Sequence, residues 1–159
     1  MSISERTLKD VLTALASDAP SPGSGAAAAV TLAFAAACAG KAVAISRKHA
    51  AEKSESMDSA QQRLGQIMRS SLERADADAK LFESFIHHKD RQSAEALVRA
   101  DESAQALARE LDGVLNEIDA AVHPVVAADI AAARVLLSAA SHIESRIRAE
   151  NQRAVPAAD

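Results

Sequence analysis

The sequence predicts an all-α protein, a bundle of about five long helices around an alanine-rich central helix. Its 159 residues include 39 alanines but only three phenylalanines, and tyrosine and tryptophan are absent. Five glycines and four prolines leave long uninterrupted stretches between them. Half-buried strands favour β-branched and aromatic side chains, whereas alanine favours helices. The composition therefore excludes sandwich and barrel folds, and the length fits one domain.

Charge and cysteine content restrict the partners. Eighteen basic and 22 acidic residues give a net charge of −4, without a basic stripe for phosphate backbones. Few aromatic rings are present for stacking on single strands, so we expect no nucleic-acid partner. The single cysteine, Cys38, cannot form an internal disulfide and fits a reducing, cytoplasmic compartment.

One charge-free stretch, residues 19–40, is long enough to be considered as a membrane span. Its alanines are only weakly apolar, and prolines and glycines interrupt its start. We therefore expect a buried helix of a bundle and no membrane partner.

The first two helices are separated by a strong break. Ser2 or Ser4 caps a helix that runs to about Ser17. Its predicted buried face consists of four apolar residues: Leu8, Val11, Leu12 and Leu15. Two prolines and two glycines then precede a helix over about 26–49. Its apolar residues lie all round, which predicts a central helix surrounded by others.

Three longer helices follow. Apolar residues at alternating three- and four-residue steps predict helices over about 55–88 and 93–122. The last helix spans about 124–152, beginning with a proline that suits a first helical turn. Residues 1–152 then form a single domain, and residues 153–159 are expected to fray.

Four acidic residues lie on apolar helix faces. Asp78 is about 60° from the centre of its stripe, Asp129 about 40° and Glu144 about 20°, while Asp101 occupies a seam position. A buried carboxylate is costly unless it is paired, hydrogen-bonded or protonated, and a raised pKa suits general acid–base catalysis. The alternatives are an ion pair with an arginine of a neighbouring helix, a solvent-facing stripe edge or a partner subunit.

The remaining features are less specific. His87 and His88 end a helix, and we expect no metal site there. The turn over residues 20–25 is either an anion cradle before a helix or a flexible connector. Lys41, an isolated charge in the apolar helix, either reaches solvent or holds an acidic ligand.

Three segments, in this order, resemble a known family. Residues 22–30, Pro-Gly-Ser-Gly-Ala-Ala-Ala-Ala-Val, resemble a PGGGS-x-AA signature. Residues 76–82 match a D-x-D-A-x-x-F pattern, and residues 123–130 are similar to an asparagine-rich turn followed by Ser-Asp. Together they resemble the cyclodeaminase/cyclohydrolase family over about residues 3–151. That family includes the C-terminal domain of formiminotransferase-cyclodeaminase and bacterial methenyltetrahydrofolate cyclohydrolases.

The resemblance implies a helical homodimer that acts on a one-carbon tetrahydrofolate without a metal or other cofactor. Substrates of this family are 5-formiminotetrahydrofolate, which closes with loss of ammonia, and 5,10-methenyltetrahydrofolate, which is hydrated and opened. The implied catalytic residues are Asp78 and Asp129. The predicted substrate-binding residues are Gly23, Ser24, Gly25, Phe82 and Asn151, together with Lys41, which, like Arg47 and Lys48, is a candidate for the folate carboxylates by charge alone.

The chain departs from the family pattern at several hydroxyl and amide positions. Ser24 replaces a glycine, Ala26 and Ala128 replace serines, and Asn151 is the one asparagine left at the close of the last helix. The alternative function is therefore a non-catalytic folate-binding or assembly protein on the same fold.

Overall fold

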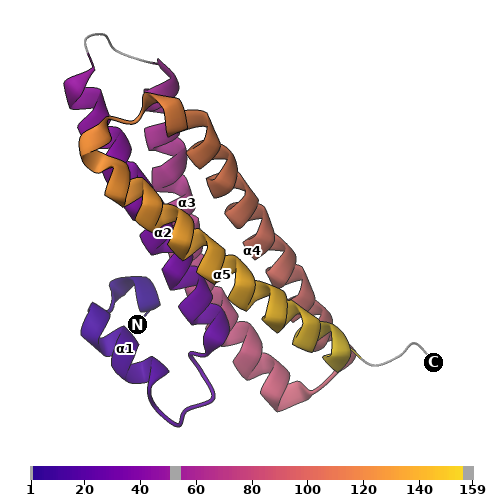
Figure 1. The fold of residues 1–159 in the computed structure, drawn as a ribbon. Coiled ribbons are helices and arrows are strands. Elements are labelled where there is room, and N and C mark those ends of the chain that lie inside the picture. Colours follow the sequence, from indigo (N-terminus) through magenta and orange to yellow (C-terminus); the bar gives the residue numbers. More distant parts are fainter. Residues whose placement is uncertain (1, 51–54, 156–159) are drawn as a thin grey trace.

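The computed structural model describes residues 2–50 and 55–155, and this part of the chain is helical without a strand (Figure 1). The elements in order are η1 (Ile3–Glu5), α1 (Leu8–Leu15), α2 (Ser24–His49), α3 (Glu55–His88), α4 (Arg91–Ile118), η2 (Asp119–Ala121), η3 (Pro124–Val126) and α5 (Ala127–Ala154), where η marks a 3₁₀ turn. The predicted all-α bundle is confirmed.

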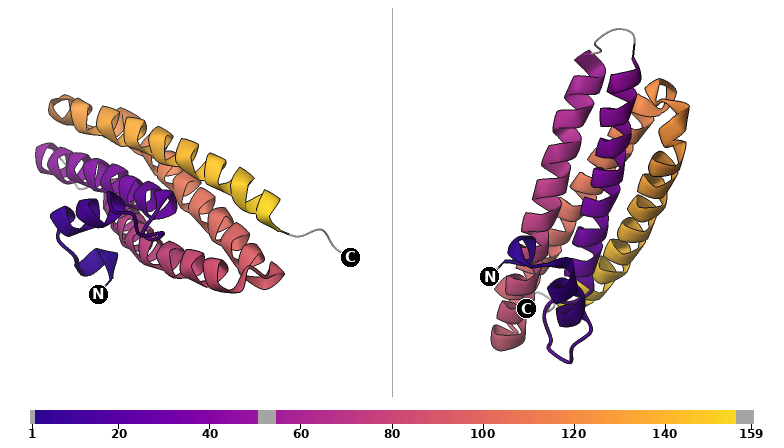
Figure 2. Two further views of the ribbon diagram at one scale, coloured as in Figure 1. Left: turned by 90° about the horizontal axis from the view of Figure 1, so that it is seen from below. Right: turned by 90° about the vertical axis from the view of Figure 1, so that its left-hand side faces the viewer.

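The four long helices form one elongated bundle (Figures 1 and 2). Helix α2 packs against α3 and α5, and α4 packs against the same two helices from the other side. The N-terminal segment with α1 lies at the end of the bundle where α2 begins.

The half of the bundle near the start of α3 has an apolar core. Leu64 and Ile67 of α3 meet Leu111 and Leu115 of α4, each at most 1% exposed. Fully buried alanines of α2, such as Ala39, let α3 and α5 approach its backbone closely.

The prediction that α2 is surrounded on all sides is wrong for the single chain. The helix buries the arc that faces α3 and α5, but Phe34 is 46% exposed on the opposite side. In a ring of four helices each helix has two close neighbours, so a helix that is apolar all round keeps one uncovered stripe. By length and composition, α2 and the segment Pro124–Ala154 are each apolar enough to cross a membrane, with 50% and 28% of the relevant stretch buried in the bundle.

The N-terminal helix also differs from its prediction. A break at Arg6 separates η1 from α1, and Thr7 caps α1 by accepting a hydrogen bond from the backbone of Asp10. Only Val11 of the predicted apolar face is buried, because α1 meets little more than the start of α2; Leu8 and Leu12 are more than half exposed.

Most other boundaries lie within a few residues of their predictions. Helix α3 has the predicted limits, whereas α4 begins earlier because Asp90 caps it and gives way to a 3₁₀ turn after Ile118. Pro124 occupies the first turn of η3, from which α5 continues to Ala154, two residues beyond the expected end. Of the expected frayed tail, residues 156–159 lie outside the described residues.

Candidate functional site

The seam between α3, α4 and α5 changes from apolar to polar along the bundle. On α3, the buried Ile67 is followed on the same face by Ser71, Arg74 and Asp78, at three- and four-residue steps. This half of the bundle, towards the α3–α4 turn, therefore has a polar interior.

An arginine joins three helices at the centre of this interior. The Nη2 atom of Arg74 donates to both carboxylate oxygens of Glu144 on α5, at 3.0 and 2.9 Å. Its Nη1 atom donates to the backbone oxygen of Ala100 on α4, at 2.6 Å. Both side chains of the ion pair are 7% exposed. Among the described residues, Arg74 is the one buried cation.

A second acid lies beside this pair. Asp101 of α4 is 2% exposed and accepts a hydrogen bond of 3.0 Å from the side-chain amide of Asn151. One turn away, Arg148 donates to Gln105 at 2.7 Å, which ties α5 to α4. Asn151, implied as a substrate ligand, thus holds the carboxylate of Asp101.

The third acid, Asp78, contacts the N-terminus of α2. It accepts a hydrogen bond from the backbone N–H of Ala26. A Cβ atom placed on Gly25 would overlap its carboxylate. Any larger residue at position 25 would therefore force the carboxylate of Asp78 away from the backbone of α2. We call Arg74, Asp78, Asp101 and Glu144 the acidic cluster.

Burial raises the pKa of each acid in the cluster. For Asp78 the positive charge of Arg74 opposes this effect and the charge of Asp101 adds to it. For Asp101 the hydrogen bond from Asn151 opposes burial, and for Glu144 the charge of Arg74 does so. Three carboxyls thus surround one buried guanidinium, and they retain protons to a higher pH than exposed acids do.

Two buried donors of the seam have no partner among the described residues. They are the Nε atom of Arg74 and the hydroxyl of Ser71, one turn apart on α3. Unpaired buried donors are costly, and they supply hydrogen bonds to an acceptor that enters the seam.

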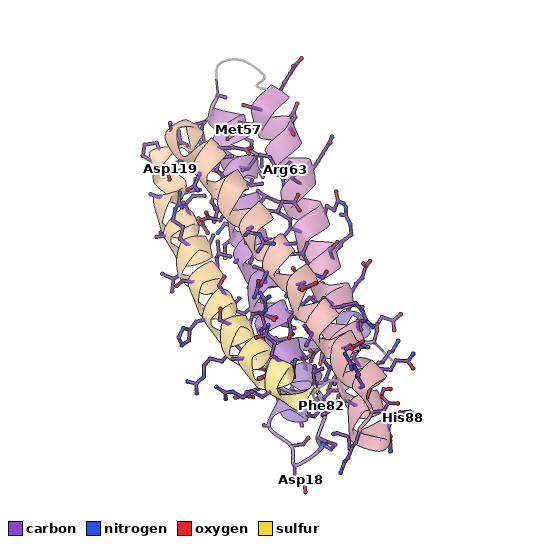
Figure 3. All side chains as sticks on the ribbon, turned by 90° about the vertical axis from the view of Figure 1, so that its right-hand side faces the viewer. Asp18, Met57, Arg63, Phe82, His88 and Asp119 are labelled. Atoms are coloured by element: carbon purple, nitrogen blue, oxygen red, sulfur yellow. The ribbon has the colours of Figure 1, made fainter. Side chains whose placement is uncertain are left out.

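Grooves on both sides of α4 reach the ion pair. The α3–α4 groove has a volume of about 490 Å³ and is lined by Ser70, Glu73, Arg74, Ala77, Ala100, Ser103 and Leu107. The α4–α5 groove has a volume of about 590 Å³ and is lined by Gln105, Ala108, Arg109, Asp112, Arg134, Leu137, Ser138, Ser141, Glu144 and Ser145. Figure 3 views the bundle from the side on which α4 and α5 run next to each other.

The structure does not bring Asp129 to this cluster within one chain. Asp129 pairs with Lys41 at 3.3 Å, and both lie towards the other end of α2. Ala26, which contacts Asp78, and Lys41 are 15 residues apart on that helix, roughly 22 Å at 1.5 Å per residue. The two implied catalytic aspartates thus occupy separate places.

The other predicted site residues lie near the start of α2 or on α3. Gly23 caps α2 and Ser24 is its first residue. Phe82 is one turn beyond Asp78 and is 36% exposed at the end of the bundle where Asp18 lies (Figure 3). Arg47, a candidate by charge alone, pairs instead with Asp58.

Sequence reasoning missed Arg74. The sequence did contain a signal for it: Arg74 is three residues after Ser71 and four before Asp78, a spacing that places all three on the same face of the helix. The acids Asp101 and Glu144 are buried as their helix faces predicted, and Glu144 forms the ion pair with a neighbouring arginine that was one of the alternatives.

Fold and site together define a class: an all-helical bundle with an apolar half and a half that buries carboxyls around an arginine. The family model for formiminotransferase-cyclodeaminase matches residues 7–147, and the chain belongs to this family of folate-related one-carbon proteins. No curated protein matches the sequence significantly.

Proposed function

We propose that the protein is a folate one-carbon enzyme, a formiminotetrahydrofolate cyclodeaminase or a methenyltetrahydrofolate cyclohydrolase, that uses acid–base catalysis. The observation that carries this proposal is the acidic cluster, since its buried carboxyls have raised pKa values and Asp78 lies against the start of α2. A raised pKa suits a carboxyl to act as a general acid as well as a general base.

The proposed chemistry needs only proton transfer at an amidine-like carbon. In cyclodeamination, N10 of the folate attacks the formimino carbon; a carboxylate removes the N10 proton, and a proton delivered to the departing nitrogen releases ammonia. In cyclohydrolysis, water adds to the methenyl carbon and a carboxylate accepts one water proton. The resulting hydroxyl then loses its proton to form the formyl C=O while the carboxyl protonates the departing nitrogen, so that one C–N bond opens and one proton is released overall. The carbon centre is cationic in both substrates, so a carboxylate-rich site stabilises it.

In this proposal Asp78 is the first proton-transfer group, and Asp101 is the acid next to it in the cluster. Asp129 stays a prediction from the family pattern, and a second subunit would have to bring it to Asp78. Lys41 already neutralises it at the surface.

We also propose that the protein works as a homodimer. The open stripe of α2 consists of Ala27, Thr31, Phe34, Ala37, Cys38 and Lys41, none of which is buried. It is apolar apart from Thr31 and its final lysine, and its small residues permit close approach of another helix. A second copy of the chain, placed antiparallel across this stripe, would cover Phe34 with apolar surface.

The non-catalytic alternative is favoured by the alanines at residues 26 and 128, where the family pattern has hydroxyls. An assay with both substrates separates the two functions. Purified protein is mixed with 5-formiminotetrahydrofolate or 5,10-methenyltetrahydrofolate while methenyl absorbance and ammonia are followed. Turnover of either substrate supports the enzyme, and binding by calorimetry without turnover supports the alternative. If the protein shows no turnover and no binding, the folate assignment is overturned.

Asp78→Asn tests the site. If Asp78 transfers the proton, the variant loses about 100-fold or more in kcat. The matched control is Glu83→Gln, an exposed acid on the same helix, which should keep wild-type turnover. Equal activity of the two variants would contradict the assignment of Asp78.

A further inference from the structure

The α4–α5 groove differs from the α3–α4 groove in the number of its arginines. The α3–α4 groove contains one cation, Arg74, whose charge is already used by Glu144, and an additional acid, Glu73. The α4–α5 groove contains two cations, Arg109 and Arg134, and two acids, the exposed Asp112 and, at its end, Glu144 of the acidic cluster. A ligand with one acidic end therefore has an arginine to pair with in the α4–α5 groove only if one of these two arginines is not already engaged.

Within this groove, Arg109 is the available cation. Arg134 is occupied by Asp119, by the side chain of Asn116 and by the backbone oxygen of Leu115. Arg109 is exposed and has no hydrogen bond or ion pair with any residue that the structure describes. An arginine fork presents parallel N–H donors that match a carboxylate.

The spacing between cluster and arginine suits an elongated ligand. Asp101 and Arg109 are eight residues apart on α4, roughly 12 Å along the axis. The serines of α5 that line the groove, at residues 138, 141 and 145, offer hydroxyls along this path. A ligand that spans it needs a basic or cationic centre at one end and a carboxylate at the other.

We infer that the α4–α5 groove binds the aminobenzoylglutamate part of the folate and that Arg109 receives a carboxylate of its glutamate. This inference rests on the proposed function and specifies the direction in which the substrate lies. The one-carbon centre is at the acidic cluster, and the tail follows the groove towards Arg109. The site replaces Lys41 and Arg47, which are paired with Asp129 and Asp58 towards the other end of α2.

The test compares ligands with and without the tail. Binding of tetrahydrofolate and of tetrahydropteroate, which lacks the glutamate, is measured by calorimetry for the wild type and for Arg109→Gln. A charge-assisted hydrogen bond predicts about 10-fold tighter binding of tetrahydrofolate to the wild type, and Arg109→Gln should abolish this preference while leaving tetrahydropteroate binding unchanged. The matched control, Arg146→Gln, changes an exposed arginine of α5 outside the groove and should keep the preference.

The outcomes separate this inference from the proposed function. If both ligands bind the wild type equally, or if Lys41→Gln and not Arg109→Gln removes the preference, the groove assignment is wrong and the folate function stands. If neither ligand binds the wild type, both fail. Because Arg109 is exposed, its variant should fold normally, and circular dichroism checks this point.

Discussion

Removing the positive charge at Arg74 should destabilise the protein in a pH-dependent way. Arg74→Met keeps much of the side-chain volume but removes both hydrogen bonds to Glu144 and the one to Ala100. Breaking a buried ion pair by deleting one partner costs about 3–5 kcal/mol. Here the pair has a side-chain exposure of 7% on both sides, so little solvent is available to replace the lost contacts.

The sign of the pH dependence follows from the three acids. Burial raises the pKa of Asp78, Asp101 and Glu144 above their unfolded values, so the folded chain holds these protons more tightly. The free energy of unfolding therefore falls as the pH rises from about 4 through the folded pKa values. Without Arg74 these pKa values rise further, and the loss should be larger at pH 8 than at pH 5.

Urea unfolding followed by circular dichroism at pH 5 and pH 8 measures both effects. The control is Arg63→Met, which removes a partly exposed arginine that pairs with Glu117 at 2.6 Å and should cost less than about 1 kcal/mol. If Arg74→Met lowers the free energy of unfolding no more than the control does, or lowers it equally at both pH values, then Arg74 does not offset the charges of the three buried acids. In Arg74→Met/Glu144→Leu, much of the lost stability should return because one uncompensated acid is gone.

Two further predictions concern α2. Gly25→Ala should lower kcat about 10-fold or more and reduce the free energy of unfolding by about 1–3 kcal/mol, because the added Cβ would overlap Asp78. The folate assay and urea unfolding measure these effects. The control is Gly113→Ala, whose Cβ would meet nothing within 4 Å. Phe34→Glu should convert a dimer to a monomer in light scattering at micromolar concentration, whereas Val125→Glu, at an even more exposed apolar residue outside the open stripe, should leave the dimer intact. A wild type that is already monomeric would contradict the dimer.

Sequence patterns predicted the long helices well because their apolar spacing is local information. The limits of α3 follow from periodicity alone, and Asp101 and Glu144 could be identified as buried acids from their helix faces. The break between η1 and α1 could not be predicted in this way, because it depends on a contact that is distant in the sequence. Asp76 accepts hydrogen bonds from the backbone of Ile3, 73 residues away, and from the hydroxyl of Ser4.

The same limit explains why the candidate site was only half predicted. The helical wheel assigned Asp78 and Asp129 to apolar faces but contained no distance between helices. Their separation is set by where α2 begins against α3 and where α5 crosses α2. The two aspartates of residues 76–78 likewise have different tasks, since Asp76 anchors the N-terminus and Asp78 contacts α2.

The energetics of the acidic cluster argue that stability alone does not account for it. The apolar half of the bundle already buries large side chains such as Leu64 and Leu111. The polar half contains three carboxyls whose raised pKa values signify a cost to folding at neutral pH, and two buried donors without a partner. Well-packed apolar residues in such a place are often neutral or stabilising. What the cluster supplies, and an apolar seam would not, is a set of carboxyls with raised pKa values at the end of a groove, and carboxyls of this kind are what the proposed acid–base chemistry uses.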